Sequence, residues 1–141
     1  LAADLLVGGA SRDALDAIRA HAWLTLVASE PLLDDAQAVI SDLGDAALAD
    51  DWREAVEGLA TLVEHPAGDH PALACAYRGD AGHLLTFDED LQSAQMGSNL
   101  RRLMDTSVRH PRAFVTVFDP EALYEATAGG TYPGPDRQPR R

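Results

Sequence analysis

The 141-residue chain contains no lysine, and all 11 of its basic residues are arginine. They are outnumbered by 23 acidic residues, which gives a formal net charge of −12 at pH 7. A surface rich in Asp and free of Lys suits a protein that stays solvated in concentrated salt, where charges are screened within about 3 Å at 1 M. We therefore expect a salt-rich cytoplasm. A codon bias toward Arg, Ala, Gly and Asp is a second explanation, and the two can coexist.

Cysteine and long apolar runs are also scarce. The single cysteine, Cys75, excludes an internal disulfide and argues against a zinc site built from several thiolates. No apolar run approaches the roughly 18 to 20 residues that span a bilayer, and the first residues lack the basic start of a signal peptide. We expect a soluble, cytoplasmic protein with one domain over residues 1–128 and a flexible Pro/Gly/Arg tail over 129–141.

Hydrophobic spacing and turn residues predict helices that alternate with strands. The expected helices cover residues 1–7, 12–22 after a Ser11 cap, 30–43, 45–64, 71–77 with an Asp69 cap, 111–115 and 119–128. The expected strands cover residues 24–28, 83–87 and 107–109. Strands separated by helices imply parallel pairing and an α/β fold in which helices sandwich a sheet. Three strands are too few for a sheet covered on both faces, so we expect a further strand ahead of Leu1.

Four acids lie at the expected starts of helices or ends of strands, namely Asp35, Asp69, Asp88 and Asp90. The carboxyl ends of parallel strands meet at one edge of a sheet, where α/β proteins bind ligands. Several carboxylates at that edge require a cation, and Mg²⁺ or Mn²⁺ is the natural choice for oxygen ligands. Such an ion can polarise a phosphodiester and activate a water molecule. The simpler alternative is that Asp88 only caps the helix that begins at Glu89.

The second half of the chain contains an acid that opens a helix, an apolar strand that runs into Thr-x-Asp-x-Asp-Leu, and a Pro-x-x-Phe sequence after the next strand. In order, they read Asp69-x-x-x-Leu73-Ala74-x-Ala76, Leu84-Leu85-Thr86-Phe87-Asp88-Glu89-Asp90-Leu91 and Val108-x-x-Pro111-x-x-Phe114. This pattern resembles the carboxyl half of a PIN domain. Upstream, Ser29-x-x-Leu32-Leu33-x-Asp35 is similar to the family's Ser-x-x-Leu-Leu-x-Glu helix, with Asp34 as an alternative acid.

The resemblance implies a three-layer α/β/α sandwich around a central parallel sheet and a Mg²⁺- or Mn²⁺-dependent endoribonuclease, here from a halophilic archaeon. It implies that Asp35, Asp69 and Asp88 are metal ligands, that Asp90 is an outer or second ligand, and that Thr86 is a positioning hydroxyl. The family's first acid lies at the end of its first strand, which we expect ahead of Leu1. The implied substrate is RNA, and small nucleases of this type often work as homodimers or beside an inhibitory protein partner.

Four arginines form the best candidate contact for RNA phosphates, namely Arg101, Arg102, Arg109 and Arg112. Pairing of these arginines with the many surface acids is an equally good interpretation.

A second interpretation of the function is a binding or scaffold protein without turnover. A haloacid dehalogenase-like phosphatase is disfavoured. Its Asp-x-Asp motif follows the first strand and works with a downstream Lys or Arg, whereas here the motif lies past mid-chain and lysine is absent. We expect His65, His70 and His83 to be cap, turn and strand-edge residues, and Trp23 and Trp52 to be core residues.

Overall fold

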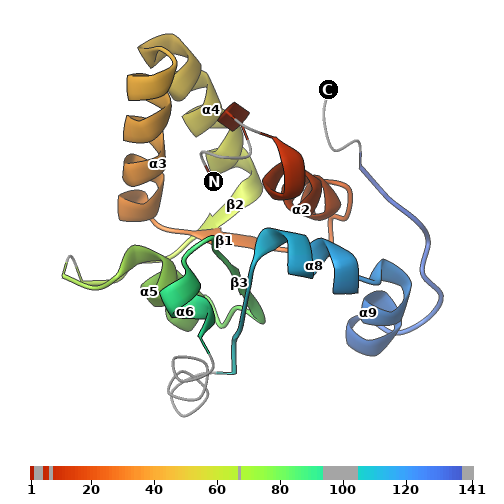
Figure 1. Cartoon of the computed structure of the whole chain (residues 1–141). Coiled ribbons are helices and arrows are strands. Elements are labelled where there is room, and N and C mark those ends of the chain that lie inside the picture. Colours follow the sequence, from red (N-terminus) through yellow and green to blue (C-terminus); the bar gives the residue numbers. More distant parts are fainter. Residues whose placement is uncertain (2–4, 7, 67, 94–104, 138–141) are drawn as a thin grey trace.

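The structure, a computed structural model, describes residues 1, 5–6, 8–66, 68–93 and 105–137 (Figure 1). Within these residues the chain forms seven helices and four short strands. In chain order these are α2 (Gly9–Arg19), β1 (Leu26–Ala28), α3 (Glu30–Leu43), α4 (Ala46–Leu59), β2 (Ala60–Leu62), α5 (Pro71–Arg78), β3 (His83–Leu85), α6 (Glu89–Gln92), β4 (Ser107–Arg109), α8 (Pro111–Val117) and α9 (Pro120–Thr127). The helix predicted over residues 1–7 falls mostly outside the described residues.

The predicted three-layer α/β/α sandwich around one central sheet is wrong. The described strands form two separate sheets of two strands each, β1 with β2 and β3 with β4. Each strand is only three residues long, and the described chain is mostly helical. Since β1 and β3 are not paired with each other, the described strands form no continuous layer that helices could cover on both faces. Parallel pairing, predicted from the helical connections, is confirmed in both sheets.

Strand β2 is a second departure from the sequence prediction, which extended the preceding helix to residue 64. Leu59 and Val63 fit a helical spacing, but α4 ends at Leu59 because Ala60 adopts an extended conformation, with φ −85° and ψ 150°. The Val63 amide then donates to the Ala28 carbonyl at 2.9 Å. Pairing with β1 therefore overrides a local pattern that favours helix.

Helices α3 and α4 form an antiparallel hairpin that carries the main hydrophobic core (Figure 1). Ser29 caps α3 and Asp45 caps α4 through their side chains, as the sequence predicts. The buried residues of this core are Ala28, Leu33, Ala36, Ile40, Ala49, Trp52 and Val56. Trp52 is therefore a core residue, as predicted. Trp23 is half-buried and lies edge-on to the ring of Tyr124, at 5.3 Å between ring centroids.

Helix α2 begins at Gly9 and has no side-chain cap, so the predicted Ser11 cap is wrong. Helix α8 packs against α2 (Figure 1). Residues of the segment predicted to be a flexible tail also contact the end of α2. The Tyr132 hydroxyl lies 2.5 Å from Nε2 of the buried His21, and Asp136 accepts a hydrogen bond from the Ala22 amide at 2.7 Å.

The described part of the chain contains no helix that could cross a membrane. None of its helices combines the length and the apolar character that spanning a bilayer requires.

Candidate functional site

The direction of helix α5 determines where the predicted acids lie. Near its carboxyl end, Gly79 lies so close to Val27 of β1 that an added Cβ would overlap the valine side chain. One turn earlier, Cys75 forms a side-chain hydrogen bond with Ser29, just past the end of β1. Helix α5 therefore runs opposite to β1, and its first turn lies near the start of α3, which it contacts.

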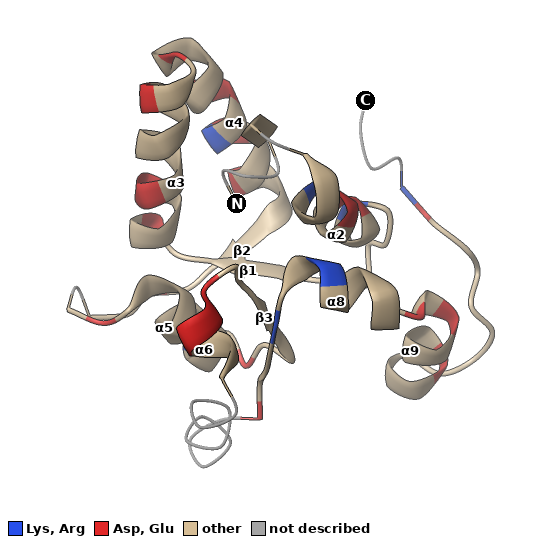
Figure 2. Cartoon of the chain, in the orientation of Figure 1, with Lys and Arg blue, Asp and Glu red and all other residues tan. Residues whose placement is uncertain are grey.

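Strand β3 follows α5 after the turn 79–82 and packs against it. Because the turn is short, β3 returns along α5, and the carboxyl ends of β1 and β3 lie toward the same end of this helix. We call this end the acidic end, because the starts of α3, α5 and α6 with their acids are directed there. Figure 2 shows acidic segments in the first half of α3, in the connection before α5 and in α6 on one side of the molecule.

On α3, the two neighbouring acids have different surroundings. Asp34 accepts a hydrogen bond from Arg53 at 2.9 Å, and Arg53 also pairs with Glu30 and with Glu57. Burial lowers the pKa of the Arg53 guanidinium, but these carboxylates outweigh the effect and the pKa is raised. Asp35 is exposed on the same helix. Asp34 is therefore committed to joining α3 with α4, and Asp35 is the better placed of the two for a ligand.

Beneath the start of α3, a buried polar network joins three segments. Ser29 is fully buried, and its Oγ lies 2.8 Å from His65 Nε2 and 3.3 Å from the Leu32 amide that it caps. His65 Nδ1 lies 3.0 Å from the Pro66 carbonyl, so a neutral ring that donates there accepts from Ser29. Burial raises the pKa of the Cys75 thiol, while its hydrogen bond with Ser29 works in the opposite direction.

Sequence reasoning missed this network. It assigned His65 to a cap, a turn or a strand edge and left Cys75 without a contact. The serine cap was the only available signal, since the three residues are distant in sequence. Pairing of β1 with β2 brings His65 to Ser29, and packing of α5 against β1 brings Cys75 there.

At the start of α5, the predicted role of Asp69 as the cap is wrong. His70 is the cap, and its Nδ1 accepts a hydrogen bond from the Leu73 amide at 3.4 Å. Asp69 is exposed, and its own amide donates to the Pro66 carbonyl at 3.1 Å. The Asp69 carboxylate is thus not used for capping, which leaves it available at the acidic end.

After β3, the Thr-x-Asp-x-Asp sequence forms a local turn of hydrogen bonds. The Asp88 amide donates to Thr86 Oγ1 at 3.0 Å, and the Asp90 amide donates to Asp88 Oδ1 at 2.9 Å. Asp88 is the cap of α6, as the simpler reading of the sequence expects. Thr86 is half-buried, whereas Asp88 and Asp90 are exposed. One carboxylate oxygen of Asp88 therefore accepts a hydrogen bond within this turn, and the other does not take part in it.

A divalent ion requires several of these oxygens together. Within the described residues, no group of three or more His, Cys, Asp or Glu side chains is arranged to hold a metal ion. The predicted ligands Asp35, Asp69, Asp88 and Asp90 do not form such a group.

The four candidate arginines separate into two groups. Arg101 and Arg102 lie outside the described residues. Arg112 is exposed on α8, whereas Arg109 is half-buried at the end of β4, and its Nε is buried without a hydrogen-bond partner among the described residues. Partial burial and the positive charge of Arg109 lower the pKa of His83. The positive charge of Arg109 therefore acts on the imidazole of His83.

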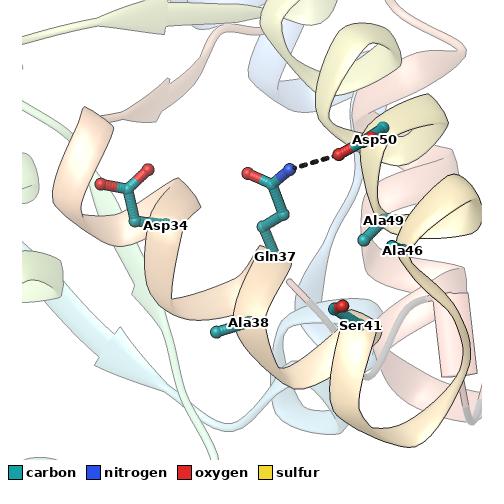
Figure 3. Close-up of a pocket in the computed structure, with 7 residues that line it drawn as sticks. All are labelled: Asp34, Gln37, Ala38, Ser41, Ala46, Ala49 and Asp50. Carbon is teal, nitrogen blue, oxygen red and sulfur yellow. Dashed lines mark hydrogen bonds between the residues drawn. The ribbon is translucent and has the colours of Figure 1, made fainter.

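A shallow groove of about 280 Å³ lies between α3 and α4 (Figure 3). Gln37 reaches across it and donates to Asp50 at 2.9 Å. Asp34, which also lines the groove, is paired with Arg53. Since these polar groups already bind one another, the groove offers little to orient a ligand, and we place the candidate site at the acidic end.

Comparisons with known proteins add a family but no activity. No curated protein sequence and no solved structure matches the chain. One family profile does match, over residues 1–140, and its description is a family of unknown function, DUF7384. Because the match covers nearly the whole chain, the protein belongs to the DUF7384 family.

Proposed function

We propose that the protein is a metal-dependent endoribonuclease that hydrolyses RNA phosphodiester bonds at the acidic end. The observation that carries the proposal is the direction of α5, which runs opposite to both β1 and β3. Three acid-bearing segments, around Asp35, Asp69 and Asp88, are thereby directed to one end of the helix. The resemblance of the sequence to the PIN family supports the same chemistry.

The proposal needs a divalent ion that binds together with the RNA. Mg²⁺ is commonly held by one or two carboxylates plus substrate phosphates, and it retains several waters. Asp35, Asp69, Asp88 and Asp90 are the residues that would supply the carboxylates. An ion held there would polarise the phosphodiester and lower the pKa of a bound water, and hydrolysis would leave 5′-phosphate and 3′-hydroxyl ends.

Cleavage of a fluorescent single-stranded RNA in Mg²⁺ or Mn²⁺ tests the proposal. Asp88→Asn is the informative variant, because Asn caps a helix as well as Asp does while removing the charge. We expect wild-type protein to cleave the RNA, and Asp88→Asn and Asp69→Asn each to be at least about 100-fold slower. Asp42→Asn is the matched control, since Asp42 is exposed near the far end of α3 and should leave the rate unchanged.

Two results would overturn the proposal, namely no cleavage with either metal, or equal cleavage by wild-type protein and Asp88→Asn.

A binding protein without turnover is the second candidate. It is favoured by the lack of a preformed three-ligand group among the described residues and by the use of Asp88 as a helix cap. Saturable RNA binding without any cleavage identifies that alternative.

A further inference from the structure

Arg109 lies beside the acidic end, although it belongs to a different strand from the acids. Its carbonyl accepts a hydrogen bond from the Thr86 amide at 3.0 Å, so the end of β4 lies next to the Thr86–Asp88 turn. The register pairs Arg109 with Leu85, the last residue of β3. The guanidinium is thus attached at the carboxyl end of the sheet, close to where the proposed reaction occurs.

The pairing of β3 with β4 also brings Arg109 and His83 onto one face. Residues alternate between the two faces of a strand, and paired residues of neighbouring strands share a face. The register therefore puts His83, Leu85, Ser107 and Arg109 on the same side. Phe114 of α8 contacts this side, because its ring meets the ring of His83 edge-on at 5.6 Å between ring centroids. Arg109 is half-buried on this side, and its Nε atom is buried.

The charge of Arg109 is not compensated by the described part of the chain. Its Nε is buried without a hydrogen-bond partner, and none of the ion pairs among the described residues includes it. A guanidinium remains charged at any ordinary pH, and a buried donor without an acceptor is unfavourable. In a chain with 23 acidic residues, a half-buried arginine without an acid indicates a place for an anion from outside.

We propose that Arg109, with His83 beside it, binds a phosphate group of RNA. This inference rests on the proposed function, and it names the part of the substrate that the protein holds. The planar guanidinium donates two parallel hydrogen bonds to phosphate oxygens. A bound phosphate offsets the positive charge of Arg109 beside His83, and the imidazole on the same face supplies a ring N–H as a further donor. Arg112, exposed three residues later on α8, offers a cation to a neighbouring phosphate and favours a polyanion over a single carboxylate.

Fluorescence anisotropy with a 3′-labelled single-stranded RNA in EDTA tests this site without metal or cleavage. We expect Arg109→Gln to bind at least about tenfold more weakly, which corresponds to loss of a charged hydrogen bond. His83→Gln should weaken binding in the same direction. Arg78→Gln is the matched control, because Arg78 is an exposed arginine at the far end of α5 and should change affinity less than twofold. Equal affinity of Arg109→Gln and wild-type protein, or an equal loss in Arg78→Gln, overturns the proposal.

The source of the phosphate is distinguished by two oligonucleotides of one sequence, with a 5′-hydroxyl or a 5′-phosphate. Tighter binding of the phosphorylated RNA that disappears in Arg109→Gln assigns the site to a terminal phosphate. Equal affinities that both fall in Arg109→Gln assign it to the RNA backbone. If neither oligonucleotide depends on Arg109, the proposal is refuted.

A measurement on wild-type protein covers the case in which Arg109→Gln fails to fold. Inorganic phosphate is titrated while the five histidine rings are followed by proton NMR, with the His83 signal assigned from the His83→Gln spectrum. We expect a saturable shift of the His83 signal, and no shift of that signal overturns the inference.

RNA binding through Arg109 without cleavage refutes only the proposed nuclease. Cleavage without any dependence on Arg109 refutes only this site.

Discussion

Replacing Ser29 by alanine tests the buried link that holds the start of α3 to the segment before α5. Ser29 is fully buried and uses one hydroxyl to cap α3 and to contact His65 and Cys75. Loss of a serine cap costs about 0.5–2 kcal/mol, and loss of a typical hydrogen bond costs about 0.5–1.5 kcal/mol. We therefore expect Ser29→Ala to lower the free energy of unfolding by about 1–3 kcal/mol.

Urea denaturation followed by circular dichroism measures this change. Asp45→Ala is the matched control, because Asp45 caps α4 at an exposed position and accepts only from the Leu48 amide, at 2.7 Å. It should cost less than Ser29→Ala. A double-mutant cycle with His65→Ala isolates the link, and we expect a coupling energy of about 1 kcal/mol. If Ser29→Ala costs no more than Asp45→Ala and the two replacements in the cycle are additive, the reasoning is refuted.

Four further predictions concern α4, α5 and the β3–β4 sheet. Gly79→Ala should destabilise the protein by about 1–3 kcal/mol through overlap with β1. By contrast, Gly58→Ala within α4, where a Cβ meets no atom within 4 Å, should stabilise it by about 0.5–1 kcal/mol in the same urea assay. Burial and Arg109 lower the pKa of His83, so the unfolded chain binds a proton first as the pH falls through the usual imidazole range. Stability should therefore decline in that range, and His83→Gln should make the decline shallower in urea titrations at a series of pH values. Cys75, buried and with a raised pKa, should react with iodoacetamide only after unfolding, and rapid labelling of native protein would contradict its placement.

Local elements were largely predictable from the sequence. The Ser29 and Asp45 caps have the side chains that satisfy free backbone amides, and the apolar spacing of α3 repeats every three to four residues. The strand near Leu84 and the cap at Asp88 follow from a β-branched and apolar run that ends in acids. These features depend on neighbours within a few residues, which is why a single sequence specifies them.

The sheet was not predictable in the same way. Residues 60–62 have a helical spacing and become β2 only because β1 offers a hydrogen-bonding edge. The single sheet inferred from the alternation of strands and helices divides into two pairs, because alternation specifies direction but not which strands become neighbours. In the candidate site, the sequence identified the acids and Arg109. It did not identify His70 as the cap of α5 or the contact of Ser29 with His65.

By itself, then, the sequence determined an acidic chain without lysine, most helix boundaries, and the acids that follow β1 and β3. Tertiary structure alone decided which of these acids are already engaged, such as Asp34 with Arg53, and that half-buried Arg109 has no acidic partner among the described residues. The physical reason is that capping and periodicity act between residues close in the chain. Pairing of strands, burial of a charge and the direction of α5 depend on residues that meet only when the chain has folded.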